Sequence, residues 1–161
     1  MPSDKASELI SEMASYFQAI NTVDGYYNTV VPEGVYFGEA NFDFKSFADN
    51  QYPLVRIQAN SLIIPEFSTK SCSKTHLEII IHGWIRKPTN RETGQDSYNN
   101  SLHWAKDLRD AFRAYLNGQD GGDVDCDLLN SEFQQQIGYS TNNVEVSSSF
   151  TLSFDEKLGV Q

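Results

Sequence analysis

The chain has 161 residues, 39% of them hydrophobic, which suits one domain with a single core. Its net charge of −10 argues against nucleic-acid binding, because affinity for phosphate comes largely from Lys and Arg. It has no run of roughly 20 apolar residues that could cross a membrane, and its charged beginning is unlike a signal peptide. We therefore expect one unprocessed cytosolic domain over residues 1–161.

The N-terminal segment predicts a helix followed by strand-forming residues. Apolar side chains recur over residues 4–21 with the period of an amphipathic helix, which should end near Asp24-Gly25. Residues 26–31 are rich in strand formers, and Pro32-Glu33-Gly34 favours a turn before residues 35–37. A hairpin or a bent strand is expected here.

Four aromatic residues mark the segment 38–52. They lie among Asn, Asp and Ser residues in a pattern too irregular for a helix or a strand, so we expect a long loop. Aromatic side chains serve both interiors and interfaces, so these four either pack on the protein's own core or dock against a neighbouring protein. The candidate interface residues are Phe42, Phe44, Phe47 and Tyr52.

Two strands are predicted in the middle of the chain. Residues 54–58 form a short strand entered through Pro53, which is tolerated at the first position of a strand. A loop or a hairpin tip is expected over residues 61–75. The strongest strand covers residues 76–85, and its residues on one face are Leu77, Ile79, Ile81 and Gly83.

The second half of the chain predicts a helix and a final strand. The helix begins at Ser97 or Ser101 and runs to about Asn117. Its apolar stripe consists of Trp104, Leu108, Ala111, Phe112 and Tyr115. Residues 119–138 are acidic and then Gln-rich, and their few apolar positions support one short helix. Residues 144–154 alternate between apolar and polar side chains, as in a half-exposed strand.

The order of these elements indicates an α+β fold. A helix, two or three strands, a helix and a strand follow one another without an internal repeat. We predict an antiparallel sheet of about four strands, with two α-helices packed on one face and long loops.

The cysteines and histidines show no spacing typical of a metal or nucleophile site. His76 and His82 would point to the same side of one strand, but about 20 Å apart. We therefore expect free thiols at Cys72 and Cys126 and structural or surface histidines, and we assign no catalytic, metal-binding or cofactor-binding residue.

An acidic segment resembles a calcium loop. It contains Asp120, Asp123, Asp125 and Asp127. Aligned with an EF-hand, however, the segment places Leu128 where the loop needs Gly and Gln134 where it needs a bidentate Glu. An irregular calcium site and a solvated acidic loop both remain open.

Four short motifs, taken in order, carry a resemblance to a known family. They are Asp24-Gly25-Tyr26-Tyr27-Asn28-Thr29-Val30, Tyr52-Pro53-Leu54-Val55-Arg56-Ile57, Ile81-His82-Gly83-Trp84-Ile85, and a helix that contains Asp107-Leu108-Arg109. Together with the length of the chain, they resemble the tail terminator proteins, also called tail completion proteins, of long-tailed bacteriophages of the siphophage type.

This resemblance implies a virion structural protein that forms a hexameric ring on the head-proximal end of the tail tube. Such a ring ends tube polymerisation and presents a surface to the head connector. The implied partners are copies of the chain itself, the tail tube protein and a head-completion or connector protein, with DNA only as passing cargo. The implied location is the virion tail, and the host cytoplasm during assembly. The family has no catalytic residues to carry over.

Other functions are weighed beside this one. A head–tail connector or neck adaptor shares the ring geometry but attaches on the portal side. A small hydrolase would need a pocket with convergent polar groups, and a calcium-dependent module would need the acidic segment to bind metal.

Overall fold

The computed structural model describes residues 5–38, 47–65, 72–87, 94–118, 126–140 and 142–157. The helices are α1 (Lys5–Gln18) and α2 (Gly94–Gly118). The strands are β1 (Val35–Phe37), β2 (Leu54–Ile63), β3 (Cys72–Arg86), β4 (Cys126–Tyr139) and β5 (Asn143–Lys157). Short 3-10 turns cover Thr22–Asp24, Pro32–Gly34 and Asp49–Gln51.

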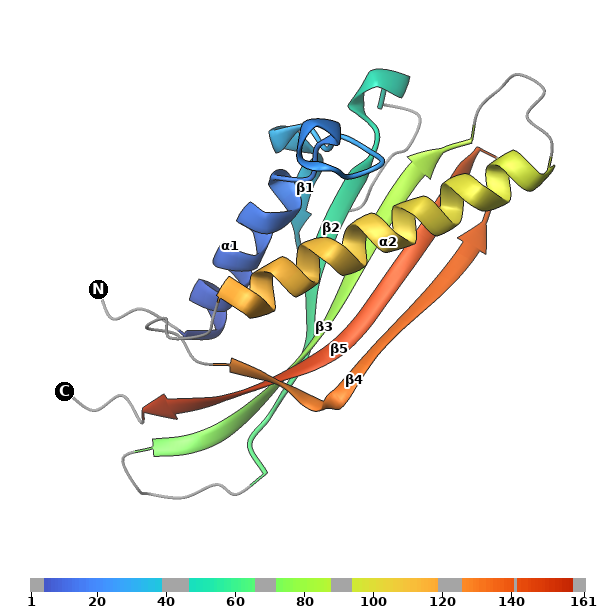
Figure 1. The fold of residues 1–161 in the computed structure, drawn as a ribbon. Helices are drawn as coiled ribbons and strands as arrows, with labels where there is room; N and C mark the ends of the chain where they lie inside the picture. The colour runs from blue at the N-terminus through green and yellow to red at the C-terminus, as the bar shows by residue number, and fades with distance from the viewer. Residues whose placement is uncertain are drawn as a thin grey trace.

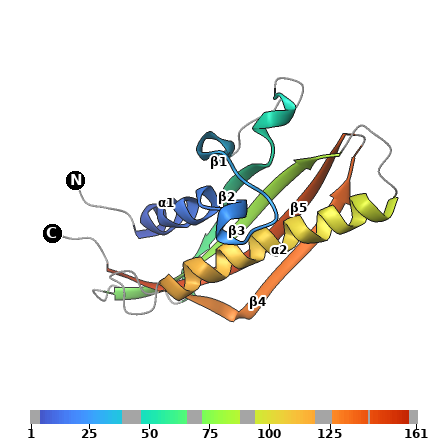
Figure 2. The same cartoon turned by 45° about the horizontal axis from the view of Figure 1, so that its top comes forward.

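The strands form one sheet in the order β1-β2-β3-β5-β4. Both helices lie on the same face of this sheet, α1 over the β1–β2 side and α2 along β3, β5 and β4 (Figures 1 and 2). The predicted α+β class is confirmed. The sheet itself differs from the prediction: it has five strands, and it is mixed because β1 runs parallel to β2. No helix in the described part of the chain is long and apolar enough to cross a membrane.

The core lies between the helices and the sheet, where the sequence pattern places it. All five residues of the predicted stripe on α2 are buried, as are Leu77, Ile79 and Ile81 on β3. Gly83 lies where α2 passes closest to β3. A Cβ atom at this position would come within 2.8 Å of both Leu108 Cδ1 and Trp104 Nε1, so the packing of the helix requires glycine here.

Residues 26–31 are not a strand, which corrects the prediction made from their composition. α1 ends at Gln18 rather than near Gly25, and the chain continues through the 3-10 turn Thr22–Asp24. The amides of Tyr27 and Asn28 donate to the buried carboxylate of Asp107 on α2, and the amide of Val30 donates to the carbonyl of Ile20. These bonds satisfy the backbone without a neighbouring strand.

The expected hairpin at residues 26–37 is also absent. Residues 35–37 pair with residues 55–57 in parallel, a contact between segments distant in sequence. The strands β2 and β3 are both longer than predicted, and they extend into the segment 61–75 that was expected to be a loop.

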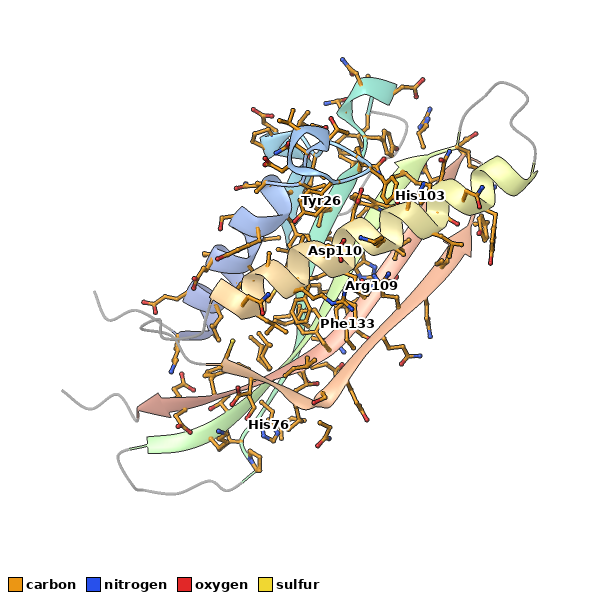
Figure 3. The ribbon with its side chains drawn as sticks, viewed as in Figure 1. Tyr26, His76, His103, Arg109, Asp110 and Phe133 are labelled. Carbon is orange, nitrogen blue, oxygen red and sulfur yellow. The ribbon has the colours of Figure 1, made fainter. Side chains whose placement is uncertain are left out.

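Residues 126–139 form the edge strand β4 instead of the predicted short helix. Phe133, Gln135 and Ile137 face the same side as Phe150, Ser148 and Val146 of β5, toward α2. The inward Gln135 is satisfied there: it accepts from Arg109 at 3.0 Å and donates to the carbonyl of Ala105 at 2.9 Å. Figure 3 shows Arg109 on α2 close to Phe133 on β4.

Candidate interaction surface

The face of the sheet opposite the helices, which we call the open face, carries the side chains that alternate with the core residues. Neither α1 nor α2 covers it (Figures 1 and 2). Strand register brings residues from β2, β3 and β5 side by side there, since Arg56 pairs with His82, His82 with Ser147, and Trp84 with Glu145. These side chains are half-buried apart from Trp84, which is 6% exposed.

Trp84 lies at the centre of a linked group on the open face. The guanidinium of Arg56 lies 5.5 Å from the Trp84 ring, and the His82 ring stacks beside it with ring centroids 5.7 Å apart. His82 Nδ1 lies 2.8 Å from Glu145 Oε1, and the hydroxyl of Ser147 donates to the same oxygen at 3.0 Å. This packing holds polar side chains in defined positions on a surface that no described helix covers.

The trio His82, Glu145 and Ser147 resembles a catalytic triad in composition but not in geometry. In such a triad, the acid and the nucleophile occupy different nitrogens of the histidine ring. Here Glu145 and Ser147 both approach Nδ1, at 2.8 Å and 3.4 Å. Ser147 also donates its hydroxyl to Glu145, so no proton relay from Ser147 through the ring is formed.

The charge state of Glu145 is set by this group. Burial alone would raise the pKa of Glu145, but hydrogen bonds from His82, Ser147 and Trp84 outweigh it and lower the pKa below its ordinary value. The residue is therefore a carboxylate at neutral pH, although it is only partly exposed.

Among the described strands, the sheet has two unpaired edges that differ in structure. At one edge is β4, whose regular pairing with β5 covers residues 133–139. At the other edge, β1 pairs only with residues 55–57 of β2, and no other described strand pairs with residues 58–63 on that side. The end of β2 is exposed and apolar: Leu62 and Ile63 are 59% and 53% exposed.

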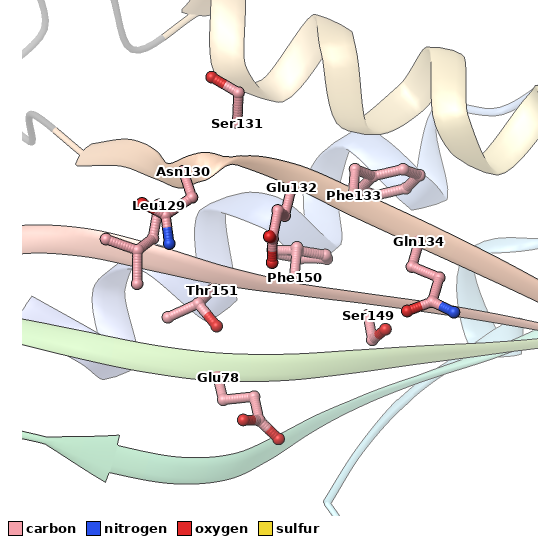
Figure 4. A pocket seen from close by; sticks show the side chains of 10 residues that line it. All are labelled: Glu78, Leu129, Asn130, Ser131, Glu132, Phe133, Gln134, Ser149, Phe150 and Thr151. Carbon is pink, nitrogen blue, oxygen red and sulfur yellow. The ribbon is translucent and has the colours of Figure 1, made fainter.

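A bend in β4 opens a groove on the open face. Asn130 and Ser131 both have positive φ, at 56° and 55°, and the register with β5 shifts between Leu128 and Phe133. The groove measures about 590 Å³ and contains the carboxylates of Glu78 and Glu132, with no cationic side chain among its lining residues (Figure 4). The shift in register is a β-bulge, and it interrupts the edge of β4. A further strand could therefore pair regularly only with residues 133–139 of β4.

A second cluster fastens the loop before β1 to α2. The Tyr27 ring stacks on His103 with centroids 3.9 Å apart, and Lys106 pairs with Asp110 on the same helix. Burial raises the pKa of Tyr26, and the nearby carboxylates of Asp110 and Asp107 raise it further. Figure 3 shows Tyr26, His103 and Asp110 along this contact. Because its ring stacks on Tyr27, His103 has a packing role.

The structure describes two of the four candidate interface aromatics. Phe47 makes edge-to-face contacts with Tyr36 and Tyr52, at centroid distances of 6.1 Å and 6.4 Å. Tyr52 also lies 5.3 Å from the guanidinium of Arg86, which binds Asp49 at 2.9 Å. Both rings are half-buried by contacts within their own chain. Phe42 and Phe44 lie outside the described residues, and the interface role of all four stays a prediction.

The remaining candidates from the sequence are placed as follows. Cys126 is a buried free thiol next to the Tyr115 hydroxyl. His76 and His82 share one face of β3, as predicted from strand alternation.

No three His, Cys, Asp or Glu side chains within the described ranges lie close enough together to hold a metal ion. Asp127 is exposed on β4, whereas Asp120, Asp123 and Asp125 lie outside the described residues.

The linked group around Trp84 on the open face could not be predicted from the sequence, because it depends on strand register. His82 and Glu145 are 63 positions apart, and neither belongs to a recognisable motif. Comparison with known proteins adds no assignment: no protein-family model matches the chain, and no curated protein matches its sequence.

Proposed function

We propose that the protein is a structural protein of long-tailed phages that closes the head-proximal end of the tail tube as a ring. Its partners are further copies of the chain, the tail tube protein and a head-completion or connector protein. The proposal assigns no catalytic residue, metal or cofactor. The sequence motifs described above support it.

The observation that carries this proposal is the pair of unlike free edges on one sheet. An edge presents unpaired backbone N–H and C=O groups that can pair with another chain. Residues 133–139 of β4 form one such edge, and residues 58–63 of β2 form the other. When two different surfaces of one subunit meet head to tail, the contact is heterologous, and a closing rotation produces a ring.

The charge of the chain also suits this role. A net charge of −10 disfavours DNA binding, because affinity for phosphate depends on Lys and Arg. DNA could therefore slide through the lumen of such a ring without being held. The same charge makes copies of the chain repel one another at long range, so ring formation needs local contacts such as the exposed Leu62 and Ile63.

Electron microscopy of the purified protein mixed with tail tubes tests the proposal. We expect a six-fold ring at one end of each tube. A ring bound to the portal of isolated heads would instead support a neck adaptor, and the absence of any ring on either structure would contradict both functions.

A pair of variants links this test to the sheet edge. The double change Leu62→Asp and Ile63→Asp places two charges at the exposed end of β2 and should abolish ring formation. The control is Val23→Asp, because Val23 is an apolar residue with 92% exposure that lies in a 3-10 turn away from the sheet. Rings that persist with the double variant would exclude this edge from the contact.

A further inference from the structure

A small pocket lies on the open face at the end where β4 turns into β5. It measures about 330 Å³ and is lined by Trp84, Gly138, Tyr139, Ser140, Asn143 and Glu145. Register explains its position, because Trp84, Glu145 and Gly138 are paired across three adjacent strands. Gly138 provides no side chain, and a Cβ atom added there would meet nothing within 4 Å. Glycine at this position therefore leaves this side of the pocket open.

The lining of the pocket is rich in hydrogen-bond acceptors and contains no Lys, Arg or His. Glu145 supplies a carboxylate that His82 and Ser147 already hold in place. Asn143 is 7% exposed, and its Oδ1 atom has no hydrogen-bond partner among the described residues. A buried acceptor without a partner is unfavourable, and a ligand that brings N–H donors would relieve it after a small side-chain adjustment.

We propose that this pocket receives the Lys or Arg side chain of a different protein. An ammonium or guanidinium group matches a preformed carboxylate, an aromatic neighbour and an unpaired amide oxygen. Because His82 and Ser147 already orient Glu145, this side chain loses little conformational freedom when a cation binds. This inference does not depend on the proposed ring, since it concerns only what the pocket binds.

Charge favours a cation from another protein over one from the described part of this chain. All eight Lys and Arg side chains that the structure describes already contact a partner within the chain. Lys74, Arg86, Lys106 and Arg113 form ion pairs, Arg109 binds Gln135, and Lys5, Arg56 and Lys87 lie over aromatic rings. The chain as a whole carries a net charge of −10, which attracts a basic partner and repels a second copy.

Short capped peptides of the form Gly-X-Gly test the pocket, with X as Arg, Lys, Gln or Glu. Binding is followed by NMR at the Trp84 indole and the Gly138 amide of the full chain. We expect saturable shifts at these two groups with the Arg or the Lys peptide, and none with the Gln or Glu peptides. Equal shifts with the Gln peptide, or none with either cation, would overturn the proposal.

Two variants separate the pocket from the rest of the open face. Gly138→Leu fills the hollow and should weaken binding of the cationic peptide by about tenfold or more. Gln136→Leu is the matched control, because it makes a similar change two positions earlier on the same strand, outside the pocket lining. Unchanged binding with Gly138→Leu would exclude the pocket.

A dilution series without peptide identifies the source of the cation. In the Leu62→Asp and Ile63→Asp background, which removes the proposed ring contact, Trp84 and Gly138 signals that still move with protein concentration alone would show that the occupant is a second copy, and the assignment to a different protein would fail. Signals that stay constant on dilution and move only with the cationic peptides support it.

Discussion

The carboxylate of Asp107 accepts two hydrogen bonds from Asn28, one from its backbone amide at 2.9 Å and one from its side-chain amide at 2.8 Å. A third bond comes from the amide of Tyr27 at 2.9 Å. Asp107 and Asn28 belong to two of the motifs that carry the resemblance to tail terminators. Their contact gives both motifs a structural role, because it holds the loop before β1 against α2.

Replacing Asp107 with Ala should destabilise the protein by about 3 kcal/mol, because three donors lose a charged acceptor in a site that is 1% exposed. Asn28→Ala removes only the side-chain bond and should lower the free energy of unfolding by about 1 kcal/mol. Urea unfolding followed by circular dichroism at one protein concentration measures both. Equal effects of the two changes would contradict the idea that Asp107 organises the loop.

Gly83→Ala should lower the free energy of unfolding by about 1–3 kcal/mol, because the added methyl group forces α2 away from β3. The new atom would lie 2.8 Å from Leu108 Cδ1 and Trp104 Nε1, both in the core. Gly138→Ala is the control, since its Cβ has open space and should change stability by less than about 0.5 kcal/mol. The same urea unfolding measurement compares them, and a neutral Gly83→Ala would show that α2 can shift without loss.

Helices and central strands could be predicted from the sequence because their burial is periodic. The stripe on α2 and the alternation in β3 and β5 follow directly from which side faces the core. β4 could not be predicted, because the inward position Gln135 is polar and hides the two-residue period. Arg109 and the carbonyl of Ala105 satisfy that side chain, and both come from a distant helix.

The parallel strand β1 and the candidate site were harder to predict than the helices and the central strands. β1 pairs in parallel with β2, and its partner is set by the packing of the chain rather than by a local turn. The pocket over Gly138 depends on register, since Trp84, Glu145 and Gly138 become neighbours only when three strands align. Sequence patterns show which side of a strand a residue occupies, but not which residue lies across from it.

The stability of the protein should fall as acid protonates Glu145. Hydrogen bonds hold the folded-state pKa of Glu145 below its ordinary value of 4.5, despite the opposing effect of burial. The carboxylate therefore stabilises the fold above about pH 4.5, and this stabilisation is lost as the pH falls through the folded-state pKa.

Glu145→Gln should lower the free energy of unfolding at neutral pH and reduce its dependence on pH below 4.5. Urea unfolding across this range measures the effect, with Glu33→Gln as a control that removes an exposed carboxylate. An unchanged pH profile in Glu145→Gln would show that the contact with His82 contributes no stability.

Cys126 should resist thiol reagents as long as β4 stays packed against α2. The residue is 9% exposed, and burial raises the pKa of its thiol, an effect that the hydrogen bond from Tyr115 only partly offsets. The thiolate that reacts with such reagents is therefore scarce at neutral pH. In a Cys72→Ser background, we expect labelling of Cys126 to be slow in buffer and to accelerate with urea as the protein unfolds. Fast labelling that does not depend on urea would show that the first residues of β4 detach from α2 while the rest of the sheet remains folded.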